Sequence, residues 1–405
     1  MDMSPVASSD AHEKFKKFQL QEELDIFHPK AHLPVELRFL KKRSKIMDII
    51  VAKDVIFALT QSGACAAFSL LSSEHIGFLN ISSDQIIRSL FYNANNESLI
   101  TVSIHASDHY TSLTCKTTSI ECIKRNHLYA GVPLFESESL KWPGFVEFDD
   151  VNGKVITYSD SIYKVFELKD YSFLYSISEK NIQDSRLGIL LLIFNRDVDY
   201  LPVKLLSIEN GTVIKSFRHL LQPNKEVINS EVIKVSCTEL MSPSDSIFLY
   251  EQQMFLTFRN RTISAWNLQG KQMTSFQDHL LYYTDLNRST ICTTTDQNII
   301  ISYCRDEGAE MDKESFAVGS INISNILTGR CVAKISSSDP NLRSIPRGRM
   351  RRSLIQSTIC QALEEVTAVF YDEDHNEIYT GNRKGLIHVW SNAPISSKIY
   401  RITDD

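Results

Sequence analysis

Two charged segments in the last quarter of the chain carry residue types that could recognise another molecule. The first is an arginine-rich segment with a terminal serine, made up of Arg343, Arg347, Arg349, Arg351, Arg352 and Ser353. Guanidinium groups donate paired hydrogen bonds to carboxylates and phosphates. The segment therefore predicts docking of an acidic partner, with phosphorylation of Ser353 as a means of reversing the local charge. A solvated loop with no partner is the alternative interpretation.

An acidic segment precedes the arginine-rich one. Its carboxylates are Asp306, Glu307 and Glu310. We expect it to join two strands of one sheet and to lie on the same face of the molecule as the arginine-rich segment. The two segments could pair with each other, but exposed ion pairs contribute only about 0–1 kcal/mol to stability. Both are therefore candidate partner-binding segments.

The remaining chemistry-bearing residues do not form a recognisable catalytic, metal or cofactor motif. His105–His109 combines histidine and aspartate at short spacing, but no cysteine pair or second histidine pair lies nearby, so we interpret it as a loop. The chain has no phosphate-cradling glycine loop and no nucleophile elbow. We therefore predict no enzyme activity, no cofactor and no metal. An enzyme assembled from distant residues is the weakest of our hypotheses.

The elements that would position these segments are short strands. Val369–Trp390 alternates apolar and polar residues in three runs separated by polar turns, which is typical of antiparallel strands. Met254–Phe276, Ile321–Ile335 and Leu206–Phe217 repeat parts of this pattern, with turn glycines at regular spacing. Tight hairpins favour such turn residues because some turn positions need a positive φ.

Repeated four-stranded units predict an all-β ring, because one such sheet cannot bury both of its faces alone. The chain divides into seven units, at roughly residues 46–80, 84–126, 141–180, 183–218, 230–276, 279–336 and 363–403. We predict a seven-bladed β-propeller over residues 46–403, with six or eight blades as alternatives. Residues 1–45 form an N-terminal extension, partly helical or disordered, with a candidate helix over His12–Phe27.

These repeats resemble the WD40-repeat family of β-propellers, clearly in the Met254–Phe276 and Val369–Trp390 units and in periodicity elsewhere. That family often buries a hydrogen-bonded His, Ser/Thr, Trp and Asp in each blade. Trp266 and Trp390 match the Trp, and Thr380 matches the Ser/Thr. Asn260 and Lys384 stand at the Asp position, and no Gly-His pair occurs in the chain. We therefore expect the tetrad to be incomplete in every blade.

The resemblance implies a platform for other proteins, with contacts on the face that carries the connections between blades. Composition agrees with a protein partner, because the formal net charge of −6 lacks the basic excess of a general nucleic-acid-binding protein. Eight cysteines without a C-x-x-C spacing are typical of buried free thiols in a reducing compartment. We also expect no membrane span, because no apolar run reaches about 18 residues.

The sequence thus predicts a non-catalytic scaffold or substrate-recruiting subunit of an intracellular complex, in the cytoplasm, the nucleus or both. Lys41–Lys45 is a basic run of the kind found in nuclear import signals. The alternative function is a chromatin- or nucleic-acid-associated propeller that binds through its arginine-rich segment. Strong salt dependence of binding would favour that alternative.

Overall fold

In the computed structural model of this chain, nearly all regular elements are β-strands. The structure describes residues 13–27, 42–141, 144–149, 153–178, 190–192, 200–206, 213–220, 232–233, 246–249, 252, 254–259, 262–267, 272–276, 279, 290–305, 318–339 and 355–392. Its short helices are η2 (Ala106–Asp108), α2 (Ile120–Lys124), η3 (Glu136–Glu138) and α3 (Ile359–Ala362). Within the described residues, no helix has the length and apolar character needed to cross a membrane.

The described strands form seven four-stranded sheets. Six sheets use consecutive strands: β2 (Ile46–Ala52), β3 (Val55–Thr60), β4 (Cys65–Ser69) and β5 (His75–Phe78); β6 (Gln85–Asn93), β7 (Ser98–His105), β8 (Thr114–Ser119) and β9 (Val132–Leu134); β10 (Phe145–Asp149), β11 (Lys154–Ser159), β12 (Ile162–Glu167) and β13 (Phe173–Ser178); β14 (Leu190–Leu192), β15 (Tyr200–Leu206), β16 (Val213–Leu220) and β17 (Val232–Ile233); β18 (Ser246–Leu249), β19 (Met254–Arg259), β20 (Thr262–Asn267) and β21 (Gln272–Phe276); β22 (Ile291–Thr293), β23 (Ile299–Arg305), β24 (Gly319–Asn325) and β25 (Cys331–Ser336). The seventh combines β26 (Val366–Asp372), β27 (Glu377–Asn382) and β28 (Leu386–Ser391) with β1 (Gln19–Asp25).

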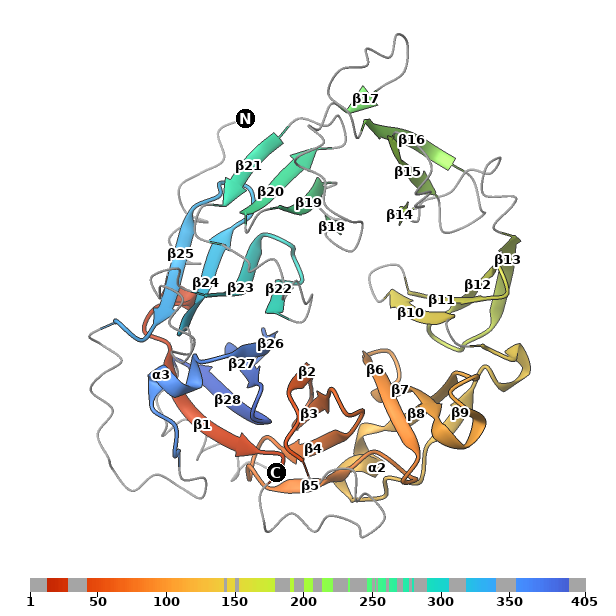
Figure 1. Ribbon diagram of the computed structural model, residues 1–405, viewed down its shortest axis with the longest axis horizontal. Coiled ribbons are helices and arrows are strands. Elements are labelled where there is room, and N and C mark those ends of the chain that lie inside the picture. Colours follow the sequence, from red (N-terminus) through yellow and green to blue (C-terminus); the bar gives the residue numbers. More distant parts are fainter. Residues whose placement is uncertain are drawn as a thin grey trace.

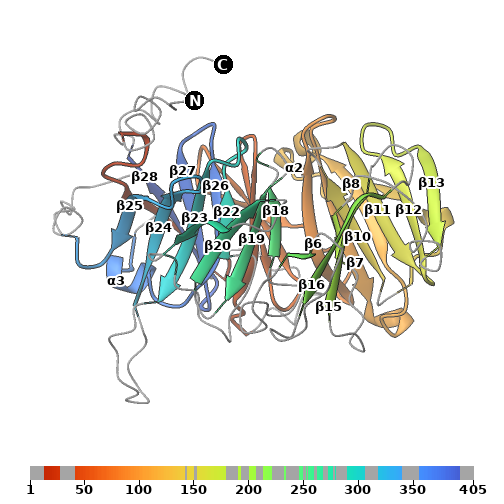
Figure 2. The ribbon, with the colours of Figure 1, turned by 90° about the horizontal axis from the view of Figure 1, so that it is seen from above.

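The sheets lie side by side around a common centre (Figure 1). The first strand in the chain is innermost in the six consecutive sheets, whereas in the seventh β26 is innermost and β1 is outermost. Seen from the side, their strands run between two opposite faces of the molecule (Figure 2). Neighbouring strands are antiparallel except β16 and β17, whose short pairing is parallel. The predicted all-β class is confirmed.

Apolar clusters fill the spaces between neighbouring sheets. Ile387 and Val389 on β28 pack into the cluster shared with the β2–β5 sheet. Trp390, the next residue, points the other way into the cluster shared with the β22–β25 sheet. Further clusters join β2–β5 to β6–β9, β6–β9 to β10–β13, and β18–β21 to β22–β25. Sheets that are covered on both faces need apolar residues on both, which explains the continuous apolar runs.

The N-terminal segment supplies a strand, so the predicted helix over His12–Phe27 is wrong for Gln19–Asp25. This segment is β1, which pairs antiparallel with β28 from Gln19↔Ser391 to Asp25↔Leu386. Leu20 and Leu24 are buried on opposite faces of the last sheet, in the two clusters that flank it. Pairing with the free edge of β28 satisfies the backbone of this segment and buries Leu20 and Leu24. These gains exceed the weak preference of its sequence for a helix. Part of the predicted extension is therefore an integral strand.

Trp390 and Thr380, the two residues that match the tetrad positions in the last sheet, are in contact. Trp390 Nε1 donates a hydrogen bond to Thr380 Oγ1 over 2.9 Å, and both side chains are fully buried. A different buried network occurs in the β22–β25 sheet. His279 Nδ1 lies 2.6 Å from Ser302 Oγ and its Nε2 lies 2.8 Å from Ser324 Oγ. Here a serine on the third strand takes the place expected for tryptophan, so polar pairing persists with other residues.

The seven described cysteines are free thiols. Cys65, Cys115 and Cys304 are buried, whereas Cys331 and Cys360 are exposed. Burial raises the pKa of the Cys115 thiol to about 12. The prediction that the cysteines are buried is therefore confirmed for Cys65, Cys115 and Cys304 but is wrong for Cys331 and Cys360.

Replacing Trp390 with alanine is expected to lower the free energy of unfolding by about 3–5 kcal/mol, because it leaves a cavity between two sheets and an unpaired Thr380 hydroxyl. Urea denaturation measures this change. Tyr129→Ala is the control, because that side chain is 75% exposed and should change stability by no more than about 0.5 kcal/mol. Equal effects of the two substitutions would contradict the assigned packing.

Burial lowers the pKa of His279 from 6.5 to about 4. The folded protein therefore binds fewer protons than the unfolded chain between these values, and stability falls as the pH drops through this window. His279→Gln should remove up to about 3 kcal/mol of that pH dependence. Denaturation at pH 7 and pH 4 measures the difference, and His75, with a similarly lowered pKa, stays present in both proteins. Identical pH profiles would refute the assignment.

Candidate interaction face

On one face of the molecule, connections between consecutive sheets meet turns between second and third strands at the corners that the structure describes. We call this face the connection face. Backbone hydrogen bonds join these two kinds of segment, as in Gln61 N to Lys45 O (2.9 Å) and Ala106 N to Asp84 O (3.0 Å). The connection face therefore consists of loops that are fastened to each other at the corners between sheets.

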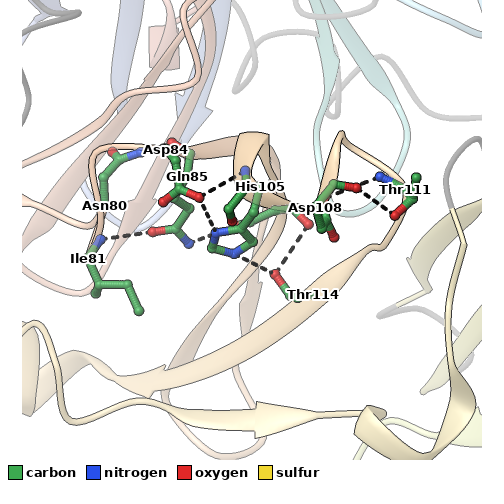
Figure 3. Close-up of polar contacts among 10 residues, drawn as sticks. Asn80, Ile81, Asp84, Gln85, His105, Asp108, Thr111 and Thr114 are labelled. Carbon is green, nitrogen blue, oxygen red and sulfur yellow. Dashed lines mark hydrogen bonds and ion pairs between the residues drawn. The ribbon is translucent and has the colours of Figure 1, made fainter.

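The corner between the β2–β5 and β6–β9 sheets is held by two buried amide side chains. Asn80 accepts a hydrogen bond from Cys65 N and donates to Gly63 O and Gln85 O, at 2.9–3.0 Å. Gln85 accepts from Ile81 N and donates to Ser103 Oγ. Figure 3 shows Asn80 and Gln85 at the start of this network. Asn80 thereby satisfies backbone groups from two sheets, and Gln85 ties the connection at Ile81 to the Ser103 hydroxyl on β7.

An aspartate and a histidine extend the same corner toward solvent. Asp84 accepts a hydrogen bond from Ser107 N at 3.2 Å, and bonds of this kind hold the pKa of Asp84 below its ordinary value. His105 Nδ1 lies 3.9 Å from Asp84 Oδ2, and its Nε2 lies 3.3 Å from Thr114 Oγ1 (Figure 3). The Thr114 hydroxyl also donates to Ser103 O. The hydroxyl proton is thus directed at a carbonyl oxygen rather than poised for transfer to the histidine.

The turn from β7 to β8 is the loop predicted for His105–His109. The Asp108 carboxylate accepts a hydrogen bond from Thr111 N, and the Asp108 backbone carbonyl accepts one from Thr111 Oγ1. His109 and Tyr110 both have φ of 59°, and both are exposed. Among the described residues, no three His, Cys, Asp or Glu side chains gather where they could hold a metal ion. The turn therefore exposes His109 and Tyr110 to solvent, where a partner protein could contact them.

A second corner, between the last sheet and the β2–β5 sheet, is lined by ion pairs. Arg43 forms a two-pronged pair with Asp25, at 2.7 and 3.0 Å, and donates to Lys384 O. Arg383 and Lys384, in the β27–β28 turn, pair with Glu365 and Glu364 at 3.3 and 3.2 Å. Arg43 belongs to the predicted basic run, so at least this member fastens the β1–β2 connection. The charges of this corner are balanced and partly exposed.

A buried contact between Glu23 and His388 lies beside the connection that enters the last sheet. His388 Nε2 lies 3.4 Å from Glu23 Oε2, and Ser357 N donates to the same oxygen at 2.9 Å. Burial opposes ionisation of Glu23, but the contacts with His388 and Ser357 outweigh it and lower its pKa to about 2. Glu23 thereby ties β1 to β28 and to the connection that enters the last sheet.

The site residues predicted from the sequence lie outside the described residues. This holds for Arg343, Arg347, Arg349, Arg351, Arg352 and Ser353, and for Asp306, Glu307 and Glu310. The described residues that follow these two segments do meet. Gly319 N donates to Leu363 O, and Tyr303 Oη donates to the same oxygen at 2.7 Å. The acidic β23–β24 loop therefore re-enters its sheet beside the end of the connection that carries the arginines.

Sequence reasoning missed His279, Glu23 and His388. His279 lies before the strands that carry its partners Ser302 and Ser324, and a search limited to Gly-His pairs passes over it. Glu23 and His388 gave no comparable signal, because their pairing depends on the register of two strands at opposite ends of the chain.

A family of proteins described as a domain of unknown function, DUF7899, matches this chain over residues 4–229 and 225–390. The chain belongs to this family. The two matches span all seven sheets of this DUF7899 protein, including β1. The search of curated proteins found no match to the chain.

Glu23→Gln is expected to destabilise the protein at neutral pH by on the order of 3 kcal/mol, because it removes the charge that His388 and Ser357 stabilise. The folded-state pKa of about 2 lies below the ordinary 4.5. The stabilisation is thus fully present above pH 4.5 and is lost as the pH falls toward 2. Denaturation of both proteins between pH 7 and pH 2 should show the gap closing. Glu74→Gln, at an exposed position, should show no gap.

Proposed function

We propose that this DUF7899 protein is a seven-bladed, WD40-like β-propeller that acts as a non-catalytic scaffold or substrate-recruiting subunit of an intracellular complex. Its partner contacts would lie on the connection face. The observation that carries the proposal is the arrangement of seven four-stranded sheets around a centre, with β1 completing the last sheet (Figure 1). Sheets closed into a ring leave only short edges, and a rigid ring presents its loops in fixed positions.

The chemistry of the described connection face supports binding rather than catalysis. The Asp84–His105–Thr114 arrangement directs its hydroxyl to a backbone carbonyl. The charged side chains Arg383 and Lys384 are paired but partly exposed, with 47% and 55% of their side-chain area open to solvent. Exposed pairs cost little to rearrange. Such groups are available to a partner without loss of the fold.

The arginine-rich segment remains the main proposed contact, because topology supports the same face for it. It joins β25 to β26, and the connection that it belongs to ends at Leu363, beside Gly319. The acidic segment joins β23 to β24 at that place. An acidic or phosphorylated partner would engage the arginines, and Ser353 would regulate that contact.

The proposal is tested by affinity purification of the full chain from cells, comparing the wild type with a variant carrying Arg347, Arg349, Arg351 and Arg352 changed to alanine. We expect the variant to lose bound proteins by about tenfold or more, because several charge-assisted contacts are removed together. Quantitative mass spectrometry measures the loss. A second variant, Arg383→Ala with Lys384→Ala, should weaken the same partners while leaving thermal stability nearly unchanged.

The matched control removes four basic side chains from the opposite face: Lys53, Lys124, Arg125 and Lys169. All four side chains are exposed. This control and the arginine variant each remove four positive charges. Unchanged binding in both connection-face variants, or equal loss in the control, would refute the proposed face. Loss of all partners on nuclease treatment, together with steep salt dependence, would instead favour the nucleic-acid alternative.

A further inference from the structure

The corner between the last sheet and the β2–β5 sheet contains a serine that follows three consecutive cations. The run is Lys41-Lys42-Arg43-Ser44, and it ends directly before β2. Residues 43–45 belong to no helix or strand, so a second protein can reach them without breaking a ladder of backbone hydrogen bonds. Kinases select their substrates in part by the pattern of charges around the target hydroxyl. A serine after consecutive cations fits a kinase with an acidic substrate groove.

The Ser44 side chain faces the turn between β3 and β4. Its Oγ accepts a hydrogen bond from Ser62 N over 3.1 Å and donates to no described residue. The hydroxyl proton is therefore not committed to an acceptor within the described part of the chain. Ser44 is half-buried, so phosphoryl transfer requires this bond to open. One such bond contributes only about 1 kcal/mol, which makes the local opening far less costly than unfolding.

The backbone of Ser44 lies against the turn between β27 and β28. Ser44 O is 3.2 Å from the position that a Cβ atom on Gly385 would occupy. That turn carries Arg383 and Lys384, which are paired with carboxylates and remain about half exposed. A group attached to Ser44 would therefore stand between two turns of the connection face, beside cations that exposed pairing holds only weakly.

Positive charge exceeds negative charge at this corner. Each of its three paired cations faces one carboxylate. Lys42 and Lys45, on either side of Ser44, form no ion pair with any described residue. These two lysines are therefore the excess. A phosphoserine carries a charge of about −1.5 to −2 at pH 7, so one phosphate is enough to neutralise it.

We propose that Ser44 is a phosphorylation site for a protein kinase that selects basic residues before serine. In the transfer, Ser44 Oγ forms a bond to the γ-phosphorus of ATP while the bond from that phosphorus to the β–γ bridging oxygen breaks. ADP leaves, and the hydroxyl proton passes to the carboxylate base of the kinase. The product is a phosphate held between the β3–β4 and β27–β28 turns, where it cancels the positive excess of the corner.

The consequence for binding rests on the proposed function. A neutral corner attracts an acidic partner less than a positive one does, so phosphorylation of Ser44 would weaken contacts on this part of the connection face. The two proposals fail in different ways. Failure of the proposed function would show as loss of partner binding in the unphosphorylated chain, whereas failure of this inference would leave Ser44 unmodified whatever the chain binds.

Incubation of the full-length protein with ATP and a purified serine kinase that selects basic residues tests the site, with the phosphate mapped by tandem mass spectrometry. Ser353→Ala is present throughout, because Ser353 also follows two arginines. We expect phosphate on Ser44, and on the order of tenfold less when Lys41→Ala and Lys42→Ala remove the recognised charges. Ser62 is the matched control: it lies at the same corner and is equally buried, but no cation precedes it within three positions. Ser62 should stay unmodified.

The ionisation of the phosphate provides a second readout. The second pKa of phosphoserine is ordinarily about 6, and neighbouring cations lower it because they favour the doubly charged form. Arg383→Ala with Lys384→Ala should therefore raise the phosphate pKa in the phosphorylated protein, which a phosphorus NMR titration measures. An unmodified Ser44, or equal labelling of Ser62, would overturn the proposed site. An unchanged phosphate pKa in this variant would overturn the proposed placement between the turns.

Discussion

Burial of both faces of every sheet is the constraint on which this structure depends. All six residues of β3 and all six of β27 are buried. A strand of that kind cannot lie in a sheet with one face in water, because its apolar surface would remain exposed. Each sheet therefore needs a neighbour on each side. Because every sheet has this requirement, a ring of sheets is favoured. In the last sheet, β1 pairs with the free edge of β28 and supplies the fourth strand.

Polar side chains in the interior have a complementary role, because apolar packing fixes no unique angle between sheets. Asn80 satisfies backbone groups from two sheets at once, and His279 joins the two inner strands β23 and β24 through Ser302 and Ser324. A buried polar group without its partner costs more than the bond contributes. These groups therefore select one relative placement of the elements they join.

Local patterns predicted the strands well and the long-range pairings poorly. The pattern of Val369–Trp390 predicted three strands and their turns, because hairpin pairing is set by neighbouring residues. β1 was not predicted, since Phe15, Phe18, Leu24 and Phe27 fit a helical spacing and nothing nearby reveals the free edge of β28. The bond from Gln21 Nε2 to Ser391 O joins residues separated by 370 positions. For the site, residue types indicated the loops, whereas the buried Glu23–His388 pair arises only from register.

The pairing of β1 with β28 also imposes an order on biosynthesis. A ribosome makes β1 well before β28, so the edge that receives β1 exists only after the six intervening sheets have been made. During that interval the amphipathic strand has no native neighbour, and Leu20 and Leu24 are available to chaperones or to wrong edges. Premature termination before β28 would leave a chain whose two ends cannot join.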